Sequence, residues 1–434
     1  MVLSSVIFFL STLTISKIQS ANAFASYSFK ENGFHQHTRV TLQSTSSSGG
    51  ESSKPPPNVL CIGETLWDSL PSGIYLGGAP SNVAVHLAYL FNSASPSSSS
   101  SSSSSGNKAS VAVATCLGKD QLGREAQRRL ALNGVRTDYV QFHSKWETGM
   151  ATALLDSNGD ATYEFNTPAA WDGLCLDSNL DCLIQQHDEQ QQTDVATNEE
   201  EKENVNDNEQ HQNVLFVMGT IAGRLDNEHE ATSLSTLMAV RNAAPEGTVV
   251  VDINLRSPWY KDTTVLELIR GSQEDTKKKL ALLKVNEEEL VTLERWCGNM
   301  DTNAEDLFGH ALKIRMEQVA ESLNTQRICV TRGDKGAALW CENGSNMASF
   351  DENPGYSLPN KKNDSDTVGA GDAFLASLIN SLFIHGETSE KALERACALG
   401  GYVAGCRGAT PAHSDAPDTL RNVFSIISSS GDDN

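Results

Sequence analysis

Short, uninterrupted apolar runs recur along the chain, and stretches of mixed polarity separate them. Apolar runs of this length, bounded by polar or glycine residues, are typical of strands that are buried on both faces. Buried strands are therefore expected at Val59–Gly63, Val111–Cys116, Val214–Met218, Val249–Ile253, Leu280–Val285 and Arg327–Thr331. Helical stretches lie between them, as at Ala79–Tyr89 and Asn303–Leu323. This alternation predicts an α/β fold, with a mostly parallel central sheet and helices on both faces.

A second pattern interrupts the alternation. Two strands, Thr152–Leu155 and Ala161–Phe165, flank the dipeptide Asn158-Gly159, which is typical of tight hairpin turns. Early strands between Leu66 and Leu76 likewise do not fit the alternation. We therefore predict a small, separate β-layer beside the main sheet.

The sequence of the first 55 residues is typical of a targeting leader rather than of a folded domain. The apolar run Val6–Ile15 is too short to span a bilayer as a helix, and Ala21-Asn22-Ala23 matches a signal-peptide cleavage site, so residues 1–23 read as a signal peptide. Residues 24–55 are rich in Ser and Thr and resemble a transit peptide with a linker. Such a two-part leader is similar to that of algae with secondary plastids, so we expect import into a plastid. Simple secretion is the alternative.

Two polar insertions interrupt the expected domain, residues 56–425. The first, about 93–106, contains the consecutive serines Ser97–Ser105, and the second, about 185–212, is rich in Gln, Asn, Glu and Asp. Such segments bury too little apolar surface to offset the entropy of ordering, so we predict disordered surface loops. Residues 426–434 form a short tail.

Composition and charge narrow the function classes. The 434 residues are 39% hydrophobic, enough for a sizeable core, and the net charge is −22. So acidic a surface repels phosphate backbones, and we expect no nucleic-acid partner. The nine cysteines contain no Cys-x-x-Cys pair, which favours free thiols over a zinc site. After the leader is removed, no membrane association is expected.

The strongest candidate for chemistry is the run Asp366–Asp372, followed at once by the apolar helix Ala373–Ile379. The small residues Gly369-Ala370-Gly371 place free backbone N–H groups at the helix entrance, where the helix dipole attracts anions. Asp372 in the first turn would lie beside a bound anion. From these residues alone, Asp372 could equally be a helix cap.

The pattern Asp-Thr-x-Gly-Ala-Gly-Asp resembles the second signature of the ribokinase/PfkB family of carbohydrate kinases. The resemblance implies a ribokinase-like three-layer fold with a small β-sheet lid, and ATP as the phosphate donor. It also implies that Asp372 is the base that deprotonates the sugar hydroxyl, and that Gly369, Ala370 and Gly371 form an anion hole. A positioned carboxylate and fixed donors are what phosphoryl transfer to an alcohol requires. No Gly-x4-Gly-Lys loop is present, which argues against a P-loop kinase.

Two early segments, Gly63–Asp68 and Leu76–Ala84, resemble the sugar-binding region of the family and are close to bacterial-type fructokinases. The resemblance implies that Asp68 and Asn82 bind sugar hydroxyls. Taken alone, Asp68 could be a turn residue, and Asn82 could be an amide on a helix surface.

Three more residues belong to this sugar end by resemblance. Gly77 and Gly78 would let the backbone approach the sugar and let the lid close. Arg256, in Asp252-Ile253-Asn254-Leu255-Arg256, would bind the substrate or its phosphate. A structural ion pair is the alternative for Arg256.

The remaining matches belong to the nucleotide and its cations. Glu289 would help hold magnesium through water, in keeping with the preference of Mg²⁺ for carboxylates and retained waters. A capped helix start, with Asn286 as the cap and Glu289 as its partner, is the alternative. Some relatives bind a monovalent cation such as potassium, and Asp366 and Val368 match those positions. By the same resemblance, the nucleotide contacts are Asn286, Thr331, Gly333, Thr367, Gly369 and Gly371.

The predicted function is ATP-dependent phosphorylation of a primary hydroxyl of a small-molecule sugar, with D-fructose to D-fructose 6-phosphate as the expected reaction. A kinase for another sugar or sugar acid, such as ribose or 2-keto-3-deoxygluconate, is the first alternative. A non-catalytic fructokinase-like protein of plastid transcription complexes is the second, but the intact run ending at Asp372 counts against it. Relatives often pair through the β lid, so a homodimer is expected by analogy.

Overall fold

The computed structural model forms one unit over Pro55–Asn434 and describes residues 55–70, 73–93, 109–155, 161–176, 180, 183, 213–225, 229–271, 278–298, 308–343, 347–356 and 367–426. Several sequence predictions lie outside these residues. They are the two-part leader, nearly all of both polar insertions, the turn at Asn158-Gly159, the first signature residue Asp366 and the C-terminal tail.

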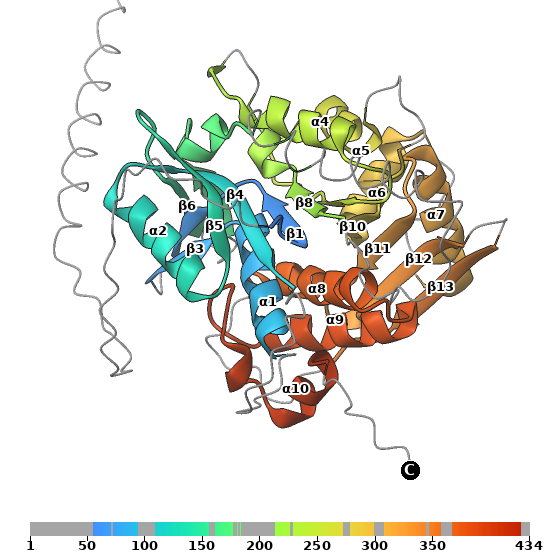
Figure 1. The fold of residues 1–434 in the computed structure, drawn as a ribbon. Helices are drawn as coiled ribbons and strands as arrows, with labels where there is room; N and C mark the ends of the chain where they lie inside the picture. Colours follow the sequence, from blue (N-terminus) through green and yellow to red (C-terminus); the bar gives the residue numbers. More distant parts are fainter. Residues whose placement is uncertain are drawn as a thin grey trace, which may run out of the picture. The chain divides into compact units, whose positions relative to one another are not determined.

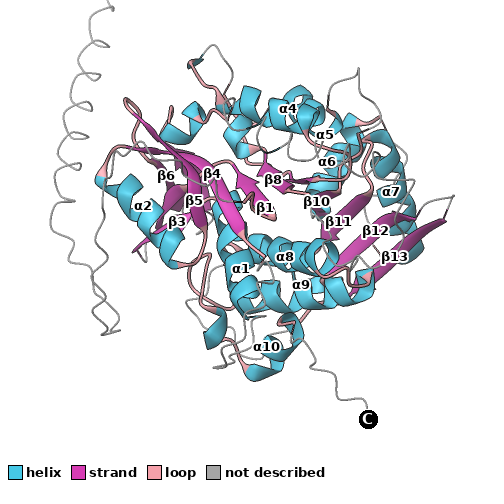
Figure 2. Ribbon diagram, in the orientation of Figure 1, coloured by secondary structure: helices cyan, strands magenta, loops and turns pink. Residues whose placement is uncertain are grey.

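The main sheet has nine strands in the order β13-β12-β11-β10-β9-β8-β1-β4-β5 (Figures 1 and 2). Neighbouring strands are parallel except in the antiparallel pairs β11–β12 and β12–β13. All six predicted buried strands are confirmed, with small shifts at their ends. The strands are β1 (Val59–Ile62), β4 (Val111–Gly118), β5 (Arg136–His143), β8 (Leu215–Gly219), β9 (Val249–Asp252), β10 (Leu282–Asn286), β11 (Arg327–Thr331), β12 (Ala337–Asn343) and β13 (Met347–Asn353).

Helices cover both faces of this sheet (Figure 1). In β1, Leu60 and Ile62 face one hydrophobic cluster, and Val59 and Cys61 face the other, because successive side chains of a strand point to opposite sides. The Leu60 face packs against α4 (Ser233–Ala243), α5 (Asp262–Arg270), α6 (Glu287–Trp296) and α7 (Gly309–Ser322). The Val59 face packs against α1 (Ala79–Ser93), α2 (Gln121–Leu132), α8 (Ala370–Ile379) and α9 (Ser389–Ala404), and α10 (Asp418–Phe424) packs on α9. The predicted three-layer α/β architecture is confirmed.

The predicted small β-layer is a second sheet of four strands, in the order β3-β2-β6-β7. The hairpin is present, since Leu155 of β6 pairs with Ala161 of β7 in an antiparallel ladder. β2 joins the two halves, antiparallel to β3 and parallel to β6. The strands are β2 (Leu66–Leu70), β3 (Gly73–Gly77), β6 (Gly149–Leu155) and β7 (Ala161–Phe165). Pairing of two chains through this sheet stays a prediction.

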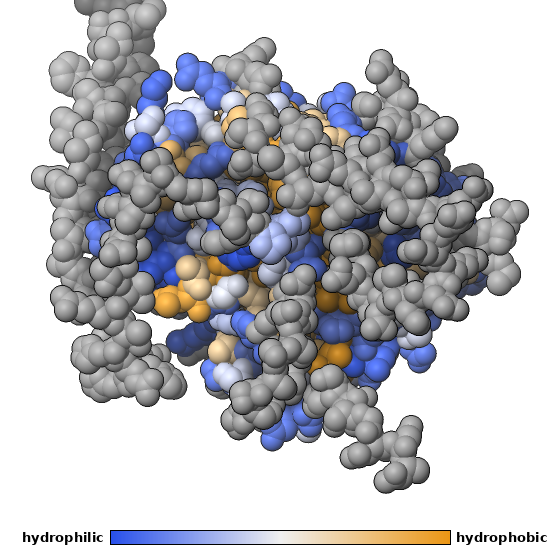
Figure 3. All heavy atoms as spheres, viewed as in Figure 1, coloured by the Kyte–Doolittle hydropathy of each residue, from blue (hydrophilic) through white to orange (hydrophobic). Residues whose placement is uncertain are grey.

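Hydrophilic side chains predominate among the described residues on the face seen in Figure 3, with apolar ones scattered between them. Of the helices that the structure describes, none combines the length and apolarity needed to cross a membrane. Eight cysteines lie in the described part, and all are free thiols, whereas Cys182 lies outside it.

Candidate active site

A pocket of about 360 Å³ opens where the carboxyl ends of the main-sheet strands meet the small sheet. The chain leaves β1 toward β4 on one side and later returns to β8 on the other, so this edge contains a topological switch point, where open α/β sheets bind ligands. The lining residues at the ends of main-sheet strands or soon after them include Glu64, Ile221, Asp252, Arg256, Asn286 and Thr331. Those from the small sheet are Leu66, Asp68, Ala151 and Phe165.

Helix α8 begins at the wall of this pocket. Its N-cap, Gly369, has a φ of +77°, and a Cβ there would lie 2.6 Å from the backbone of Ala409, so only glycine fits. Gly369 and Gly371 both line the pocket. The N–H of Ala370 donates to the carbonyl oxygen of Thr367 at 3.3 Å. The start of the helix still lies at the pocket wall, and its dipole favours an anion there.

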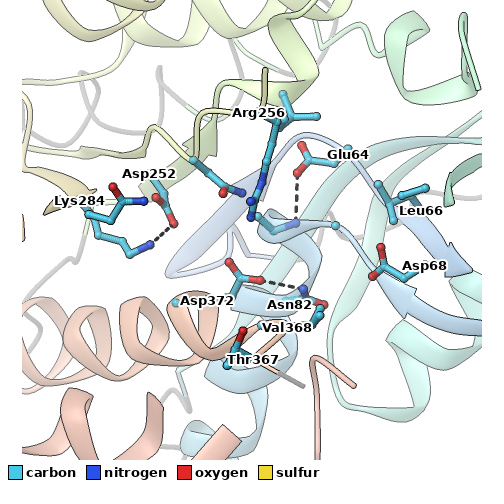
Figure 4. A pocket seen from close by; sticks show the side chains of 18 of the residues that line it. Glu64, Leu66, Asp68, Asn82, Asp252, Arg256, Lys284, Thr367, Val368 and Asp372 are labelled. Carbon is cyan, nitrogen blue, oxygen red and sulfur yellow. Dashed lines mark hydrogen bonds and ion pairs between the residues drawn. The ribbon is translucent and has the colours of Figure 1, made fainter. Parts of the chain in front are cut away.

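Asp372 is buried in the first turn of α8, but it does not cap the helix, because Gly369 is the N-cap. The cap interpretation is therefore wrong. Oδ2 of Asp372 accepts a 2.8 Å hydrogen bond from Nδ2 of Asn82, which lies in α1 (Figure 4). Asn82 is 4% exposed, so it is not a surface amide either.

The environment of Asp372 raises the pKa of its carboxyl group. Burial and the charge of Asp252 raise its pKa to about 6, although the Asn82 hydrogen bond and the cations Lys284 and Arg256 oppose this rise. A carboxylate with such a pKa is ionised at pH 7 and is still a competent proton acceptor.

The sugar-end residues also meet at the pocket. Asp68 lies within β2, not in a turn, and it lines the pocket. Gly77 is not among the lining residues, but a Cβ there would lie 2.0 Å from Oδ2 of Asp68, so glycine makes room for that carboxylate. Gly78 lines the pocket with a φ of +103°, and a Cβ there would lie 2.4 Å from the carbonyl oxygen of Glu64.

Arg256 is exposed at the pocket and has no ion-pair partner among the residues that the structure describes. Its charge lowers the pKa of Asp372, and both residues line the pocket. The alternative of a structural ion pair finds no support in this geometry.

Lys284 and Asp252 form a buried ion pair that sequence reasoning did not assign to the site. Nζ of Lys284 lies 2.8 Å from Oδ2 of Asp252, and a Cβ on Gly371 would lie 3.1 Å from that Nζ. Burial lowers the pKa of Lys284, but the carboxylates of Asp252 and Glu289 outweigh burial and raise it. A permanent ammonium therefore lies beside the α8 entrance (Figure 4). The sequence signal was a single Lys inside the apolar strand Leu282–Asn286.

Asn286 and Glu289 line the pocket and also form the capping box that was considered as their alternative role. The two Glu289 oxygens accept 2.8 Å hydrogen bonds from the backbone N–H groups of Leu255 and Asn286. Burial and the charge of Asp252 raise the pKa of Glu289. Oδ1 of Asp252 is buried and has no hydrogen-bond partner among the described residues.

The carboxylates of Asp252 and Glu289 fit magnesium through its bound water. No group of three or more His, Cys, Asp or Glu side chains in the described ranges could hold a metal ion by itself. The orphaned Oδ1 of Asp252 and the second lone pairs of Glu289 can instead receive hydrogen bonds from metal-bound water, which Mg²⁺ retains readily.

The predicted nucleotide residues lie at the pocket with one exception. Asn286, Thr331, Thr367, Gly369 and Gly371 line it, whereas Gly333, which starts a short 3-10 helix (Gly333–Lys335), is not among the lining residues. Val368, predicted for a monovalent cation, also lines the pocket, but Ala370 of the predicted anion hole does not. Asp366 lies outside the described residues.

A family model of pfkB family carbohydrate kinases matches residues 73–416. The chain belongs to this family. Its fold is that of a carbohydrate kinase.

The kinase is 27% identical over 399 residues to the probable chloroplastic fructokinase-6 of Arabidopsis thaliana, over 87% of this chain and 85% of that protein. It superposes with a TM-score of 0.54 on the aminoimidazole riboside kinase of Salmonella enterica, at 20% identity over 85% of this chain and 99% of that one. A fructokinase double mutant of Vibrio cholerae, with fructose, ADP and potassium bound, gives a TM-score of 0.53 at 20% identity, over 82% and 94% of the two chains. At these identities, the structural likeness shows the fold.

Proposed function

We propose that this kinase transfers the γ-phosphoryl group of ATP to a primary hydroxyl of D-fructose and forms D-fructose 6-phosphate. The observation that carries the proposal is the buried Asp372 carboxylate, held by Asn82 at the entrance of α8 and beside the Lys284 ammonium. Fructokinase relatives in plants and bacteria support fructose as the acceptor.

In the proposed reaction, Asp372 accepts the proton of the sugar hydroxyl while the hydroxyl oxygen forms a bond to the γ-phosphorus of ATP. The bond from that phosphorus to the bridging oxygen of ADP breaks on the opposite side. Charge spreads over the γ-phosphoryl oxygens, where the N-terminus of α8 and the ammonium of Lys284 can stabilise it. Because these groups are fixed before the reaction, they need no reorganisation during it.

The acceptor sugar would lie between the small sheet and α8. Asp68 and Asn82 would accept and donate hydrogen bonds to its hydroxyls, and Arg256 would contact the sugar or the transferred phosphate. Gly77 and Gly78 would leave room for this approach. The nucleotide would extend toward the ends of β10 and β11, near Asn286, Thr331, Gly333 and Thr367.

Two cations belong to the proposal. Glu289 and Asp252 would hold the water shell of a magnesium ion, which neutralises phosphate charge when it is bound. Asp366 and Val368 would contribute to a potassium site, and the potassium in the Vibrio cholerae fructokinase structure supports this expectation.

Asn82→Ala should shift the pH dependence of catalysis upward. In the wild type, kcat/KM for the sugar should fall as Asp372 becomes protonated near pH 6, because only the carboxylate accepts a proton. The Asn82 hydrogen bond lowers the pKa of Asp372, so its loss moves this ionisation to higher pH. The pH–rate profiles of wild type, Asn82→Ala and the control Asn133→Ala, which lies outside the pocket, measure the shift. An unchanged ionisation in Asn82→Ala would refute the link.

Plastid import is the proposed localisation, and the chloroplastic relative supports it. A fluorescent protein fused behind residues 1–55 should accumulate in the plastid of an alga with a secondary plastid. Secretion of the fusion would exclude that localisation.

A panel of acceptors tests the substrate. ADP release by the full-length protein should be fastest with D-fructose and slower with ribose and 2-keto-3-deoxygluconate. A higher kcat/KM for either of the other two would replace fructose as the substrate, and no turnover with any sugar would refute the proposed function.

A further inference from the structure

Glu64 is a buried carboxyl group at the sugar end of the pocket, and one of its oxygens lacks a partner. It follows β1, is 3% exposed and lines the pocket. Its Oε1 accepts a 3.1 Å hydrogen bond from the backbone N–H of Ala79 (Figure 4). Its Oε2 is buried without a hydrogen-bond partner among the described residues. A buried acceptor in this condition costs free energy unless a ligand or water completes it.

A second buried group, the guanidinium of Arg224, also has polar atoms without a hydrogen-bond partner among the described residues. Arg224 follows the 3-10 helix Ile221–Gly223, and its side chain is fully buried. Nη2 donates to Oδ2 of Asp172 at 2.9 Å, and the guanidinium lies 4.3 Å from the ring centroid of Trp171. Nε and Nη1 have no hydrogen-bond partner in the described structure.

Arg224 and Glu64 act on each other through charge without forming an ion pair. The Arg224 charge lowers the pKa of Glu64, yet no contact within ion-pair distance joins them. Two aromatic rings frame the guanidinium at 5.7 Å and 5.9 Å, those of Phe165 and Trp259, and Phe165 also lines the pocket. The Ala79 hydrogen bond therefore holds the Glu64 carboxyl group in place, the Arg224 charge favours its ionised form, and the residue lines the pocket.

We propose, on the basis of the proposed function, that Glu64 is a further sugar-binding residue whose Oε2 accepts a hydrogen bond from a hydroxyl that is not phosphorylated. Arg224 is the positioning residue that favours its charge. A sugar hydroxyl can donate one hydrogen bond and accept two, so it satisfies the orphaned oxygen. The neighbouring ring of Phe165 offers an apolar surface for the C–H groups of the same sugar. Asp372 instead contacts the hydroxyl that is phosphorylated.

The charge state of Glu64 gives the proposal a second readout. Burial, with a smaller contribution from the charge of Asp372 on α8, raises the pKa of Glu64 to about 7, although the backbone N–H groups of Glu64 and Ala79 and the charge of Arg224 oppose the rise. Sugar binding through the carboxylate should therefore weaken as pH falls through about 7. Glu64→Gln should lack this ionisation and keep the one assigned to Asp372.

Single-hydroxyl analogues of D-fructose test the contact. We expect Glu64→Ala to lower kcat/KM for D-fructose by about 10- to 100-fold, the range for a hydrogen bond to a charged group, with KM for ATP unchanged. One of 1-deoxy-D-fructose, 2,5-anhydro-D-mannitol, 3-deoxy-D-fructose and 4-deoxy-D-fructose should be a poor substrate for wild type and suffer little further loss in Glu64→Ala. The same loss with D-fructose and every analogue, or no loss at all, would overturn the proposal.

Three further variants separate binding from structure. Ser81→Ala is the matched control, because Ser81 contacts the Glu64 carbonyl and Thr65 but not the carboxyl, and it should affect all analogues equally. Arg224→Gln should raise the pH at which the Glu64 ionisation appears, and Arg224→Lys should restore it. If that ionisation does not move, Arg224 has no positioning role.

Failure of the Glu64 proposal can be distinguished from failure of the proposed function. If Glu64→Ala does not fold, Glu64→Gln takes its place in the measurements with D-fructose and its analogues, because the amide keeps an oxygen that accepts the Ala79 hydrogen bond. If wild type phosphorylates no sugar, the proposed function fails, and calorimetric titration with D-fructose still tests the contact. Weaker binding to Glu64→Gln than to wild type supports it, whereas equal binding or no binding to either overturns it.

Discussion

Asp372→Asn should lower kcat with D-fructose by about 10²–10⁴-fold, the usual contribution of a general base. The amide has nearly the shape of the carboxylate, and its oxygen can still accept the hydrogen bond from Asn82. It cannot accept the proton of the sugar hydroxyl. KM for the sugar and for ATP should therefore change much less than kcat, and steady-state kinetics on full-length protein measure both.

The fold of Asp372→Asn should be intact, and its thermal stability not lower than that of wild type. Burial raises the folded-state pKa of Asp372 above its ordinary value, so at pH 7 its charge opposes folding. Removing the charge removes that cost. Asp418→Asn, an exposed position on α10, is the matched control and should keep full activity. Near-normal kcat in Asp372→Asn would refute base catalysis.

Lys284→Met should lower kcat by about 10²–10³-fold, the range for removal of one fixed group that stabilises transition-state charge. The ammonium lies next to Gly371 at the α8 entrance, where the transferred phosphoryl group is proposed to develop charge. Lys284→Arg should recover part of the activity, because it returns a positive charge with a different shape. A loss of less than about threefold in Lys284→Met would remove Lys284 from the chemistry.

The same variant also leaves a buried carboxylate unpaired. Breaking a buried ion pair at one partner costs about 3–5 kcal/mol of stability, so chemical denaturation must accompany the kinetics. The double variant Asp252→Asn with Lys284→Met removes both charges and should recover stability without activity. Recovery of activity as well would mean that the single variant had failed only through misfolding.

The main sheet was predictable because its inner strands have uninterrupted apolar sequences. β5 was missed for a physical reason: it is the edge strand Arg136–His143, only partly buried, and its mixed sequence lacks an apolar run. β12 and β13 turn back antiparallel after β11, and no α-helix lies between β11 and β12. The hairpin β6–β7 was found because its turn chemistry is local.

The site was predictable only as far as its motifs were local. The glycine turn of α8 could be read from neighbouring residues, but the bond that decides the role of Asp372 comes from Asn82, 290 positions away in the chain. The candidate roles of Lys284 and Glu64 follow only from their surroundings. Nζ of Lys284 lies close to Gly371, and Oε2 of Glu64 has no hydrogen-bond partner among the residues that the structure describes. Burial and contacts of this kind are set by tertiary packing, and no spacing in the sequence encodes them.

The most direct test is to measure ADP and sugar phosphate together, from ATP and D-fructose, with full-length wild type and Asp372→Asn. We predict one D-fructose 6-phosphate for each ADP in the wild type, and a loss of both products of about 10²–10⁴-fold in the variant. ADP formed without sugar phosphate, or equal rates of sugar phosphate formation in the two proteins, would contradict a sugar kinase in which Asp372 is the base.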